Sequence, residues 1–449
     1  MLAGGYEDEL SELLSISKTM VLNGGDKLFT YFVDWISDKT DAQNTGAMDR
    51  LLEKLDTLTM SNRELPPINT IATSDILNEN TDEYIGIEGL RNAVIRFLGS
   101  VVTSKQTCNL KLYSDQNMGW LAADLVFMQK WGALMYNVAL KNRIQIIHNI
   151  DRNLSEMLVA IEKWLPLYMT GMIDAFYCKK AVDGRFAHTF FIAPQLAAIN
   201  ASIVVGTENM GKYQYINTAV NVLYYESQFD ALMEMSKPLV QVFNEQSLTQ
   251  YHFRMTVMAK QEGGTKKLLS SISIATMPRS LLEKILIRNE IDQKEKDNII
   301  AFHNTCVQQF EKELQSGSVI EYVALPGDEA LFSGEVALNL SALFLCQPIM
   351  YTTEEYSEHI NAIISLLSEN DSYNLVLLPD SPFAHIQMTV KRDMGAMILK
   401  NDGPSVAFWF GHPMMCRAFD EYLDGISEKS RIPVGNQNGL FSMLRKYII

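Results

Sequence analysis

The sequence predicts an α/β protein in which two related α/β domains follow a short helical segment. The stretch Ile144–Ile150 is apolar on both faces, as in a strand buried within a parallel sheet. A polar run follows, and apolar residues then recur at helical spacing from Leu154 to Leu165. The order helix, several strands, helix occurs near residues 154–242 and again near 354–423. This repetition predicts a duplicated α/β unit whose two halves pair about a pseudo-twofold axis.

A chain of 449 residues is too long for one hydrophobic core, and 47% hydrophobic residues are typical of a well-packed globular protein. A polar stretch around Pro66 and Pro67 reads as a linker. We therefore expect four segments. They are a helical segment at 1–60, a linker at 61–85, a first α/β domain at 86–245 and a second at 246–449.

Composition and charge exclude several classes of function. The net charge of −15 disfavours a large surface that neutralises phosphates or anionic membranes. The five cysteines are scattered and form no CxxC pair, so reduced thiols are expected. No apolar run is long enough to span a bilayer, and Glu7, Asp8 and Glu9 stand where a signal peptide would be basic. These features predict a cytoplasmic protein that does not act at a membrane.

The first 60 residues predict three short helices, at Glu9–Met20, after Asp26, and at Ala47–Leu58. Small helices ahead of a large α/β body raise the possibility of a helix-turn-helix module. This segment, however, carries five Lys and Arg against eleven Asp and Glu. That balance favours a packing or dimerising bundle over contact with nucleic acid.

Helices and strands alternate along the first α/β domain. The predicted elements are a helix at Gly89–Leu98, a strand at Cys108–Tyr113, a long helix capped by Ser114 or Asp115 and reaching Val138, the strand and helix at 144–165, strands at Ile173–Cys178, His188–Ala193 and Ser202–Val205, and a closing helix around Tyr224–Val242.

The second domain repeats this order. The predicted elements are helices at Arg279–Arg288, Lys294–Leu314 and Tyr356–Leu367, strands at Tyr373–Leu378, His385–Arg392, Gly395–Lys400 and Ser405–Phe410, and a final helix that contains Met415, Phe419 and Tyr422.

The best candidate for a binding site is the polar loop after the strand that begins at Ile144. Ligands of open α/β sheets bind at the carboxyl ends of strands, where helix N-termini favour anions. The candidate ligand-binding residues are His148, Asn149, Asp151 and Arg152. In the alternative interpretation, Asp151 and Asn153 only cap the following helix, with Glu156 completing a capping box, and Arg152 is solvated.

Two known phosphate-handling patterns are incomplete. Gly206–Lys212 fits the first part of the phosphate-loop spacing, but Tyr213 replaces the Ser or Thr that would hold magnesium, and a strand is predicted next. Two halves with a histidine near a strand end also suggest a phospholipase D-like fold. That chemistry needs a Lys two residues after each His, which neither His148 nor His385 has. A related fold without the catalysis is the expectation.

No metal site or cofactor is predicted. His303 with Cys306 and His412 with Cys416 are isolated pairs, whereas a tetrahedral site needs more ligands, so core packing is the simpler interpretation. The sequence also lacks a nucleophile elbow, an H-E-x-x-H motif and a dinucleotide-binding glycine motif. The aromatic residues on the helical stripes are assigned to the core.

Several runs of sequence resemble a known family. They are Ile87–Leu98, Leu112–Trp120, Ile146–Arg152, Trp164–Gly171 and Phe190–Pro194. Together they resemble the large C-terminal region of helix-turn-helix regulators of anaerobic Gram-positive bacteria, in which a Cro-like DNA-binding domain precedes the body. The resemblance covers about residues 86–245 well and implies a sensor or effector body. At its front this chain departs from the family pattern, because a complete DNA-binding domain is not recognisable.

The resulting functional hypothesis is a non-catalytic sensor that binds a small molecule or protein near His148 and shifts the helical segment or a homodimer contact. Two alternatives remain open. One is a hydrolase-like enzyme that uses His148 or His385, and the other is an interaction scaffold without a pocket.

Overall fold

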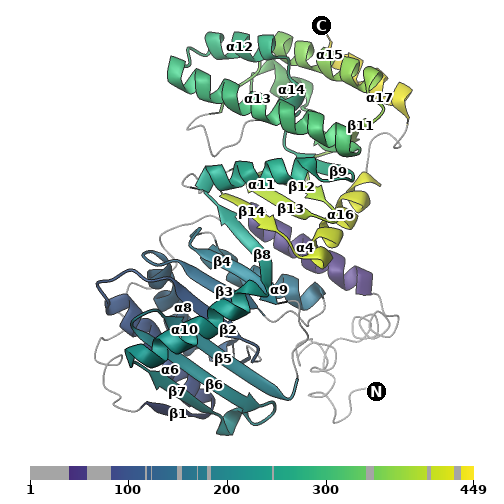
Figure 1. The fold of residues 1–449 in the computed structure, drawn as a ribbon. Helices are drawn as coiled ribbons and strands as arrows, with labels where there is room; N and C mark the ends of the chain where they lie inside the picture. Colours follow the sequence, from purple (N-terminus) through teal and green to yellow (C-terminus); the bar gives the residue numbers. More distant parts are fainter. Residues whose placement is uncertain are drawn as a thin grey trace, which may run out of the picture.

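The computed structural model of the chain describes residues 40–57, 82–116, 119–122, 124–148, 154–168, 170–178, 184–244, 247–339, 348–401, 406–428 and 436–448. The protein has a mixed α/β fold built on one mixed sheet of fourteen strands (Figure 1). None of the described helices combines the length and the apolar character needed to cross a membrane.

The strands fall into two groups along the chain. The first group is β1 (Glu83–Ile85), β2 (Leu110–Ser114), β3 (Ile144–His148), β4 (Ile173–Cys178), β5 (Phe186–Ala193), β6 (Ala197–Val204), β7 (Lys212–Ile216) and β8 (Ser236–Phe243). The second is β9 (Thr265–Leu269), β10 (Val319–Ala324), β11 (Tyr373–Leu378), β12 (Ile386–Lys391), β13 (Gly395–Lys400) and β14 (Val406–Phe410).

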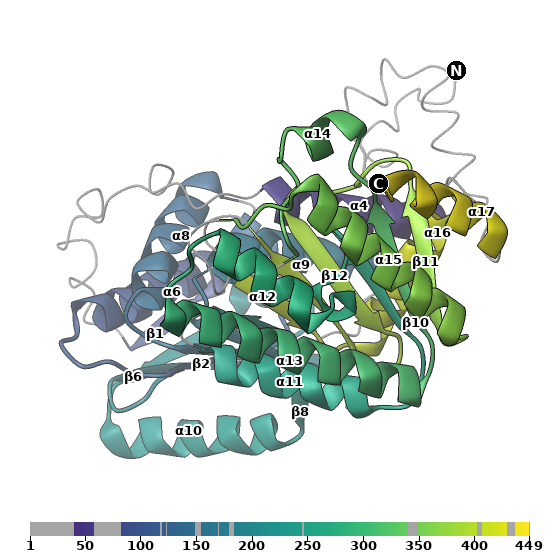
Figure 2. The ribbon, with the colours of Figure 1, turned by 90° about the horizontal axis from the view of Figure 1, so that it is seen from above.

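Helices cover both faces of this sheet (Figure 2). In the first half they are α4 (Thr40–Thr57), α6 (Gly86–Thr103), α7 (Gly119–Ala122), α8 (Leu125–Ala139), α9 (Leu154–Tyr168) and α10 (Ala219–Glu234). In the second half they are α11 (Leu248–Lys260), α12 (Arg279–Arg288), α13 (Gln293–Ser316), α14 (Asp328–Phe332), α15 (Thr353–Glu369), α16 (Pro413–Ser427) and α17 (Gln437–Leu444). Short 3-10 turns lie at Glu208–Met210, Ile274–Thr276 and Arg445–Tyr447.

The same strand order occurs twice. In the first half β2, β3 and β4 are parallel neighbours, β5 pairs antiparallel with the other side of β2, and β6 and β7 continue outward. In the second half β9, β10 and β11 are parallel, β12 pairs antiparallel with β9, and β13 and β14 continue. The extra strand β8 pairs with β4 on one side and with β14 on the other. One continuous sheet therefore contains both halves.

A side-chain pattern accompanies the repeated order. The pairing of β2 with β3 begins at Leu110↔Ile144, and the pairing of β9 with β10 begins at Thr265↔Val319. Lys111 and Lys266 are each the next residue, so they occupy corresponding positions. Each lysine forms ion pairs with two carboxylates that lie four residues apart on one helix. This helix is α10, after β7, in the first half and α16, after β14, in the second. The pairs are Lys111 with Glu226 at 3.0 Å and Asp230 at 2.6 Å, and Lys266 with Asp420 and Asp424, each at 2.8 Å.

Helix α4 joins the two halves through apolar contacts. It packs against α9 of the first half and α16 of the second. Five apolar side chains at helical spacing are at most 3% exposed there, which explains why the sequence pattern predicted a helix here, although it begins at Thr40 and not at Ala47. They are Ala47, Met48, Leu51, Leu52 and Leu55. The other two helices expected in the first 60 residues lie outside the described residues.

Asp56, at the end of α4, forms a polar connection to the second half. Its carboxylate accepts hydrogen bonds from three consecutive backbone N–H groups just before and at the start of β12. The donors are Ala384 at 3.1 Å, His385 at 2.6 Å and Ile386 at 3.1 Å. The ammonium group of the fully buried Lys400 donates to the Asp56 carbonyl at 2.8 Å. Charge-assisted hydrogen bonds of this kind hold the helix end in one position.

Two expectations about helices are wrong. The helix expected over Tyr224–Val242 ends at Glu234, and residues 236–243 form strand β8. Pro238 cannot continue a helix, and the valines after it favour a strand. The long helix after Cys108–Tyr113 is two helices, α7 and α8, and Asp124 caps the second by accepting from two backbone N–H groups. Ser114 ends β2 and caps neither of them.

The expected parallel sheet over residues 108–205 is correct for β2, β3 and β4 but wrong for β5 and β6, which form an antiparallel hairpin. Both strands alternate in burial, as expected of a hairpin, and the sequence signal was too weak to distinguish the two pairings. The remaining predicted strands of the second half match β11 to β14 within one residue at each end.

The buried imidazole of His359 makes the stability of the second half depend on pH. Its Nδ1 lies 2.9 Å from the Tyr351 hydroxyl and its Nε2 lies 3.0 Å from the Thr276 hydroxyl. Burial, and after it the charge of nearby His303, lowers the pKa of His359 from 6.5 to about 3. The folded protein therefore keeps this ring neutral while the unfolded chain protonates it.

We predict that the stability contributed by neutral His359 is complete above about pH 6.5 and is lost as the pH falls toward 3, because the unfolded state then binds more protons. In urea unfolding between pH 4.5 and 7.5, His359→Gln should flatten the slope by up to about 1.4 kcal/mol per pH unit. The control variant is His188→Gln in the first half. An unchanged slope in His359→Gln contradicts the prediction.

Candidate ligand-binding cavity

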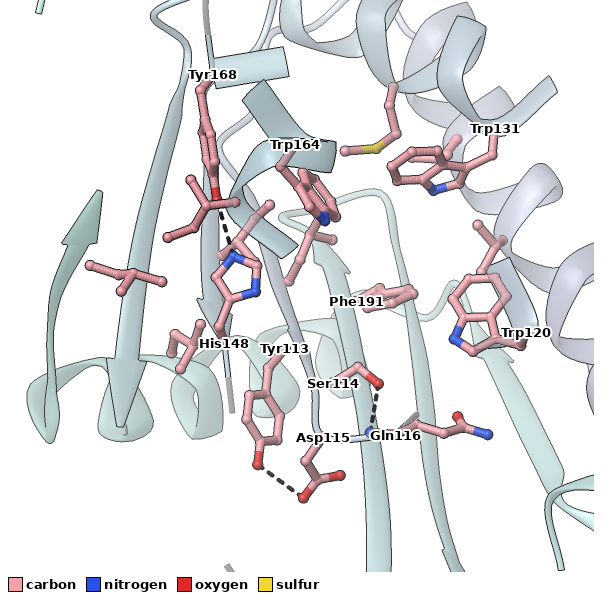
Figure 3. A pocket seen from close by; sticks show the side chains of 18 of the residues that line it. Tyr113, Ser114, Asp115, Gln116, Trp120, Trp131, His148, Trp164, Tyr168 and Phe191 are labelled. Atoms are coloured by element: carbon pink, nitrogen blue, oxygen red, sulfur yellow. Dashed lines mark hydrogen bonds between the residues drawn. The ribbon is translucent and has the colours of Figure 1, made fainter. Parts of the chain in front are cut away.

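A cavity of about 120 Å³ lies at the carboxyl ends of β2 and β3 (Figure 3). The strand floor and the helices α6, α8 and α9 supply most of its wall. Its lining residues are Val94, Phe97, Leu98, Leu112, Tyr113, Ser114, Asp115, Gln116, Trp120, Trp131, Met135, Ile146, Ile147, His148, Met157, Ile161, Trp164, Tyr168, Phe191 and Leu239. This is the strand-end crevice in which the sequence predicts a ligand.

Aromatic rings form much of the wall. Trp164 packs edge-on against Trp131, with ring centroids 5.3 Å apart, and the ring centroid of His148 lies 6.0 Å from that of Trp164. Met157, Ile161, Trp164 and Tyr168 recur every three or four residues along α9, which places all four on the helix face toward the sheet. The amphipathic stripe that forms α9 thus also forms one wall of the cavity.

A hydrogen-bond network fixes the polar side chains at the end of β2. Ser114 and Thr189 have their hydroxyl oxygens 3.3 Å apart, and the Thr189 hydroxyl donates to Gln116 Oε1 at 3.2 Å. Gln116 Nε2 in turn donates to the Tyr213 hydroxyl at 2.7 Å. The amide oxygen and nitrogen of Gln116 are therefore both engaged within the protein.

The carboxylate of Asp115 has two internal donors. The Tyr113 hydroxyl donates to Asp115 Oδ2 at 3.1 Å, and the backbone N–H of His188 donates to Oδ1. Burial, and after it the negative charge of Asp115, raises the pKa of Tyr113, so this phenol is protonated at neutral pH. Asp115 thus acts here as an acceptor that organises the strand end.

His148 and Tyr168 meet at another part of the wall. The Tyr168 hydroxyl lies 3.3 Å from His148 Nε2 (Figure 3). Tyr168 is 1% exposed, and burial raises the pKa of its hydroxyl, so it remains a neutral phenol. A neutral phenol beside an imidazole provides a hydrogen-bonding pair within an otherwise aromatic wall.

Trp120 contributes a polar group with no partner among the described residues. Its indole Nε1 is buried and has no hydrogen-bond partner there, although buried polar groups almost always have one. The backbone of the same residue is held firmly, because Arg91 Nε and NH2 donate to the Trp120 carbonyl at 3.0 and 2.9 Å. Arg91 itself is 8% exposed.

The structure places one of the four predicted site residues. His148 ends β3 and lines the cavity. Asn149, Asp151 and Arg152 lie outside the described residues, as does Asn153 of the expected capping box.

Sequence reasoning missed the residues that distinguish this cavity. Three of the five tryptophans, Trp120, Trp131 and Trp164, line it, but aromatic residues on helices were assigned to the core. Arg91 is buried and binds the Trp120 carbonyl, a role that the helical pattern around it does not indicate. The available signal was the concentration of tryptophans around a predicted strand end.

The other candidate motifs have structural explanations. Gly206–Lys212 connects β6 to β7 through a 3-10 turn and leads into a strand, as expected for a connecting loop. His303 is buried, and its Nε2 lies 2.9 Å from the Met277 carbonyl oxygen. The ring of His412 packs against Tyr177 at 4.6 Å. Across the described ranges, no three His, Cys, Asp or Glu side chains gather to hold a metal ion.

The two histidines compared with phospholipase D chemistry are not at corresponding positions. The ladder β2–β3 aligns with β9–β10, so His148 corresponds to Val323. Ile192 of β5 pairs with Lys111, and Val390 of β12 pairs with the corresponding Lys266, so Ile192 corresponds to Val390. Five residues earlier in each chain segment, Ala187 therefore corresponds to His385. The repeated strand order therefore does not produce a symmetric pair of histidines.

Comparisons with known proteins assign no family to this chain. No family model and no curated protein matches it. Among solved structures, the archaeal chromatin protein TrmBL2, described as showing a novel mode of DNA binding, has 11% identity and a TM-score of 0.26 over 49% of this chain and 71% of its own. Yeast tyrosyl-DNA phosphodiesterase has 9% identity and a TM-score of 0.18 over 73% of this chain and 89% of its own. At such TM-scores neither structure assigns a function.

We predict that Arg91→Lys lowers the free energy of unfolding by about 1–2 kcal/mol, because one ammonium group cannot reproduce the two-pronged contact with the Trp120 carbonyl. Urea unfolding measures the change, and tryptophan fluorescence reports any loosening of Trp120. Arg143→Lys is the matched control, since Arg143 is 49% exposed and pairs with Asp174 at the surface. Its effect should stay within about 0.5 kcal/mol. Equal effects of the two variants contradict the prediction.

Proposed function

We propose that this protein is a sensor that binds a small, mostly apolar molecule in the cavity at the ends of β2 and β3. The observation that carries the proposal is this cavity, lined by aromatic side chains with a few fixed polar groups. Binding sites for small molecules have this composition, and in α/β sheets they have this location.

The volume of the cavity limits the ligand. Cavities of about 150 Å³ lined by apolar side chains stay dry and take up benzene. At about 120 Å³, this cavity is slightly smaller, so its volume restricts the ligand to about the size of a single ring. A protein that only packs its core fills such a space, because each unfilled cavity costs stability.

The position of α4 supports a way to transmit binding. Helix α9 lines the cavity with one face and contacts α4, where Lys54 lies 3.4 Å from Glu162. In the same last turn of α4, Asp56 connects the helix to residues 384–386 of the second half. A ligand that favours one position of α9 would therefore also favour one position of α4.

This role agrees with the resemblance to the C-terminal bodies of helix-turn-helix regulators. We extend the proposal accordingly to a cytoplasmic, non-catalytic effector body of a regulator-like protein. In it, two α/β domains of common origin, of a phospholipase D-like kind without the catalytic histidine–lysine pairs, are joined through β8. The repeated strand order and the repeated lysine–carboxylate ion pairs support the common origin.

Toluene is the probe for the first test. We predict that it binds the wild-type protein, and that at ten times its Kd the free energy of unfolding rises by about 1.4 kcal/mol. Val94→Phe places a ring into the cavity and should weaken toluene binding by about tenfold or more. Titration followed by NMR gives the affinities, and thermal unfolding confirms that the variant is folded.

Val126→Phe is the matched control, because Val126 is 63% exposed on α8 and does not line the cavity. It should leave toluene affinity unchanged. If Val94→Phe does not fold, Ile161→Phe on α9 fills the cavity from another side. The sensor proposal is wrong if toluene, tested to its solubility limit, does not bind, or if it binds equally well to a folded cavity-filling variant.

The second test concerns transmission. We predict that toluene slows backbone hydrogen exchange in α9 and also in α4, because the two helices pack together and α4 is anchored at Asp56. Asp56→Asn should confine the effect to α9. Helix α12, which packs on α13 and α15, provides the internal control and should not respond. A response limited to α9 in the wild-type protein would show that α4 does not transmit binding.

A further inference from the structure

We infer that the ligand of this cavity is an uncharged, flat ring compound that presents a hydrogen-bond acceptor to the indole N–H of Trp120. The inference rests on the proposed function, because it names the class of molecule that the cavity binds. Its basis is one buried donor and the chemistry of the surrounding wall.

The donor is Trp120 Nε1. Trp120 is 6% exposed, and its indole nitrogen has no hydrogen-bond partner within the part of the chain that the structure describes. A buried donor left without an acceptor costs the free energy of its lost hydration. Figure 3 shows the nitrogen-bearing edge of the indole turned toward the space between Phe191 and Gln116. A ligand in the cavity can therefore supply the missing acceptor.

The described part of the chain does not provide this acceptor. Gln116 Oε1, an acceptor in the same cavity wall, accepts from Thr189, while the amide nitrogen of Gln116 donates to Tyr213. Trp120 is also held in place, since Arg91 binds its carbonyl and its ring packs on Phe127 with centroids 5.7 Å apart. Rotating the Gln116 amide or the Trp120 indole so that the two meet would break these hydrogen bonds and ring contacts.

The wall also restricts the charge of the ligand. No Lys or Arg is among the described residues that line the cavity, so an anion bound against them would lose its hydration without a compensating charge. The carboxylate of Asp115 already accepts from Tyr113 and His188. A cation would have aromatic faces to bind but could not satisfy Trp120, because a cation without a lone pair offers no acceptor. A neutral acceptor satisfies all of these constraints.

The shape follows from the rings around the cavity. Trp131 and Trp164 stand edge to face, and Phe191 lies beside Phe97 with centroids 6.4 Å apart. Planar side chains at these angles leave slots that suit another planar group, because aromatic pairs favour offset and edge-on contacts. A single ring with a small acceptor such as a nitrile or carbonyl fits both the shape and the volume.

The test compares benzonitrile with toluene, which have nearly the same shape and differ in the acceptor. In the wild-type protein labelled with ¹⁵N at its indoles, benzonitrile should move the Trp120 N–H resonance downfield, and toluene should not. Trp120→Phe should weaken benzonitrile binding by about 3- to 10-fold and change toluene binding by less than about twofold.

Trp131→Phe is the matched control. It removes the same bulk from the same wall but leaves the Trp120 N–H in place, so it should affect the two probes equally. Benzoate and N-methylpyridinium, which carry opposite charges on a similar frame, should bind at least about tenfold more weakly than benzonitrile.

The outcomes separate this inference from the sensor proposal. If toluene and benzonitrile both fail to bind, the cavity is not a ligand site and both ideas are wrong. If both bind and Trp120→Phe weakens them equally, the sensor proposal stands and the acceptor inference is wrong. Tighter binding of N-methylpyridinium than of benzonitrile also overturns the inference, because the site would then be a cation cage.

Discussion

The antiparallel pairing of β8 with β14 determines how the whole molecule is arranged. Without it, the two halves would be separate sheets of similar strand order, each with its own helices. Because β8 also pairs with β4, the backbone hydrogen bonds run without interruption from one half to the other. The pairing brings α9 of the first half and α16 of the second to the same side of the sheet, where α4 packs against both. The contact between the cavity wall and the second half depends on this continuity.

The two halves share a strand order but use the corresponding space differently. In the first half, Leu112 of β2 lies beside Ile146 of β3, and both line the cavity. In the second half, the corresponding ladder pair is Lys267, whose side chain is 12% exposed, with the buried Glu321. Lys267 pairs there with Glu313 at 2.6 Å, and the Tyr373 hydroxyl donates to Glu321 at 2.8 Å. Charges in such a place need partners at close range, so polar side chains occupy the corresponding floor of this half, whereas an apolar floor can leave room for a ligand.

Local patterns in the sequence were enough to predict most elements, while the site depended on contacts between distant residues. The apolar stripes of α4, α9, α13 and α15 and the strands β11 to β14 were predictable because burial imposes a period on each segment. Strand β8 was missed because a run of apolar residues fits both a helix and a strand. The bond from Arg91 to the Trp120 carbonyl spans 29 residues, and no local pattern indicates it. The strand-end rule located the cavity at His148, but which aromatic residues complete it depends on how α6 and α8 pack.

Helix α4 makes two different kinds of contact, and this difference matters for the proposed sensor. Its apolar face packs on α9 through dispersion and burial, which depend weakly on direction and allow small movements. Its Asp56 carboxylate is held by hydrogen bonds from three backbone N–H groups. Hydrogen bonds are directional, so Asp56 cannot move far without losing one of them. A small shift of α9 would therefore be absorbed by the apolar contacts of α4 until it strains the hydrogen bonds of Asp56, which are either made or broken. In the proposed sensor, a two-state contact of this kind would turn a small change in packing into a discrete change in the second half.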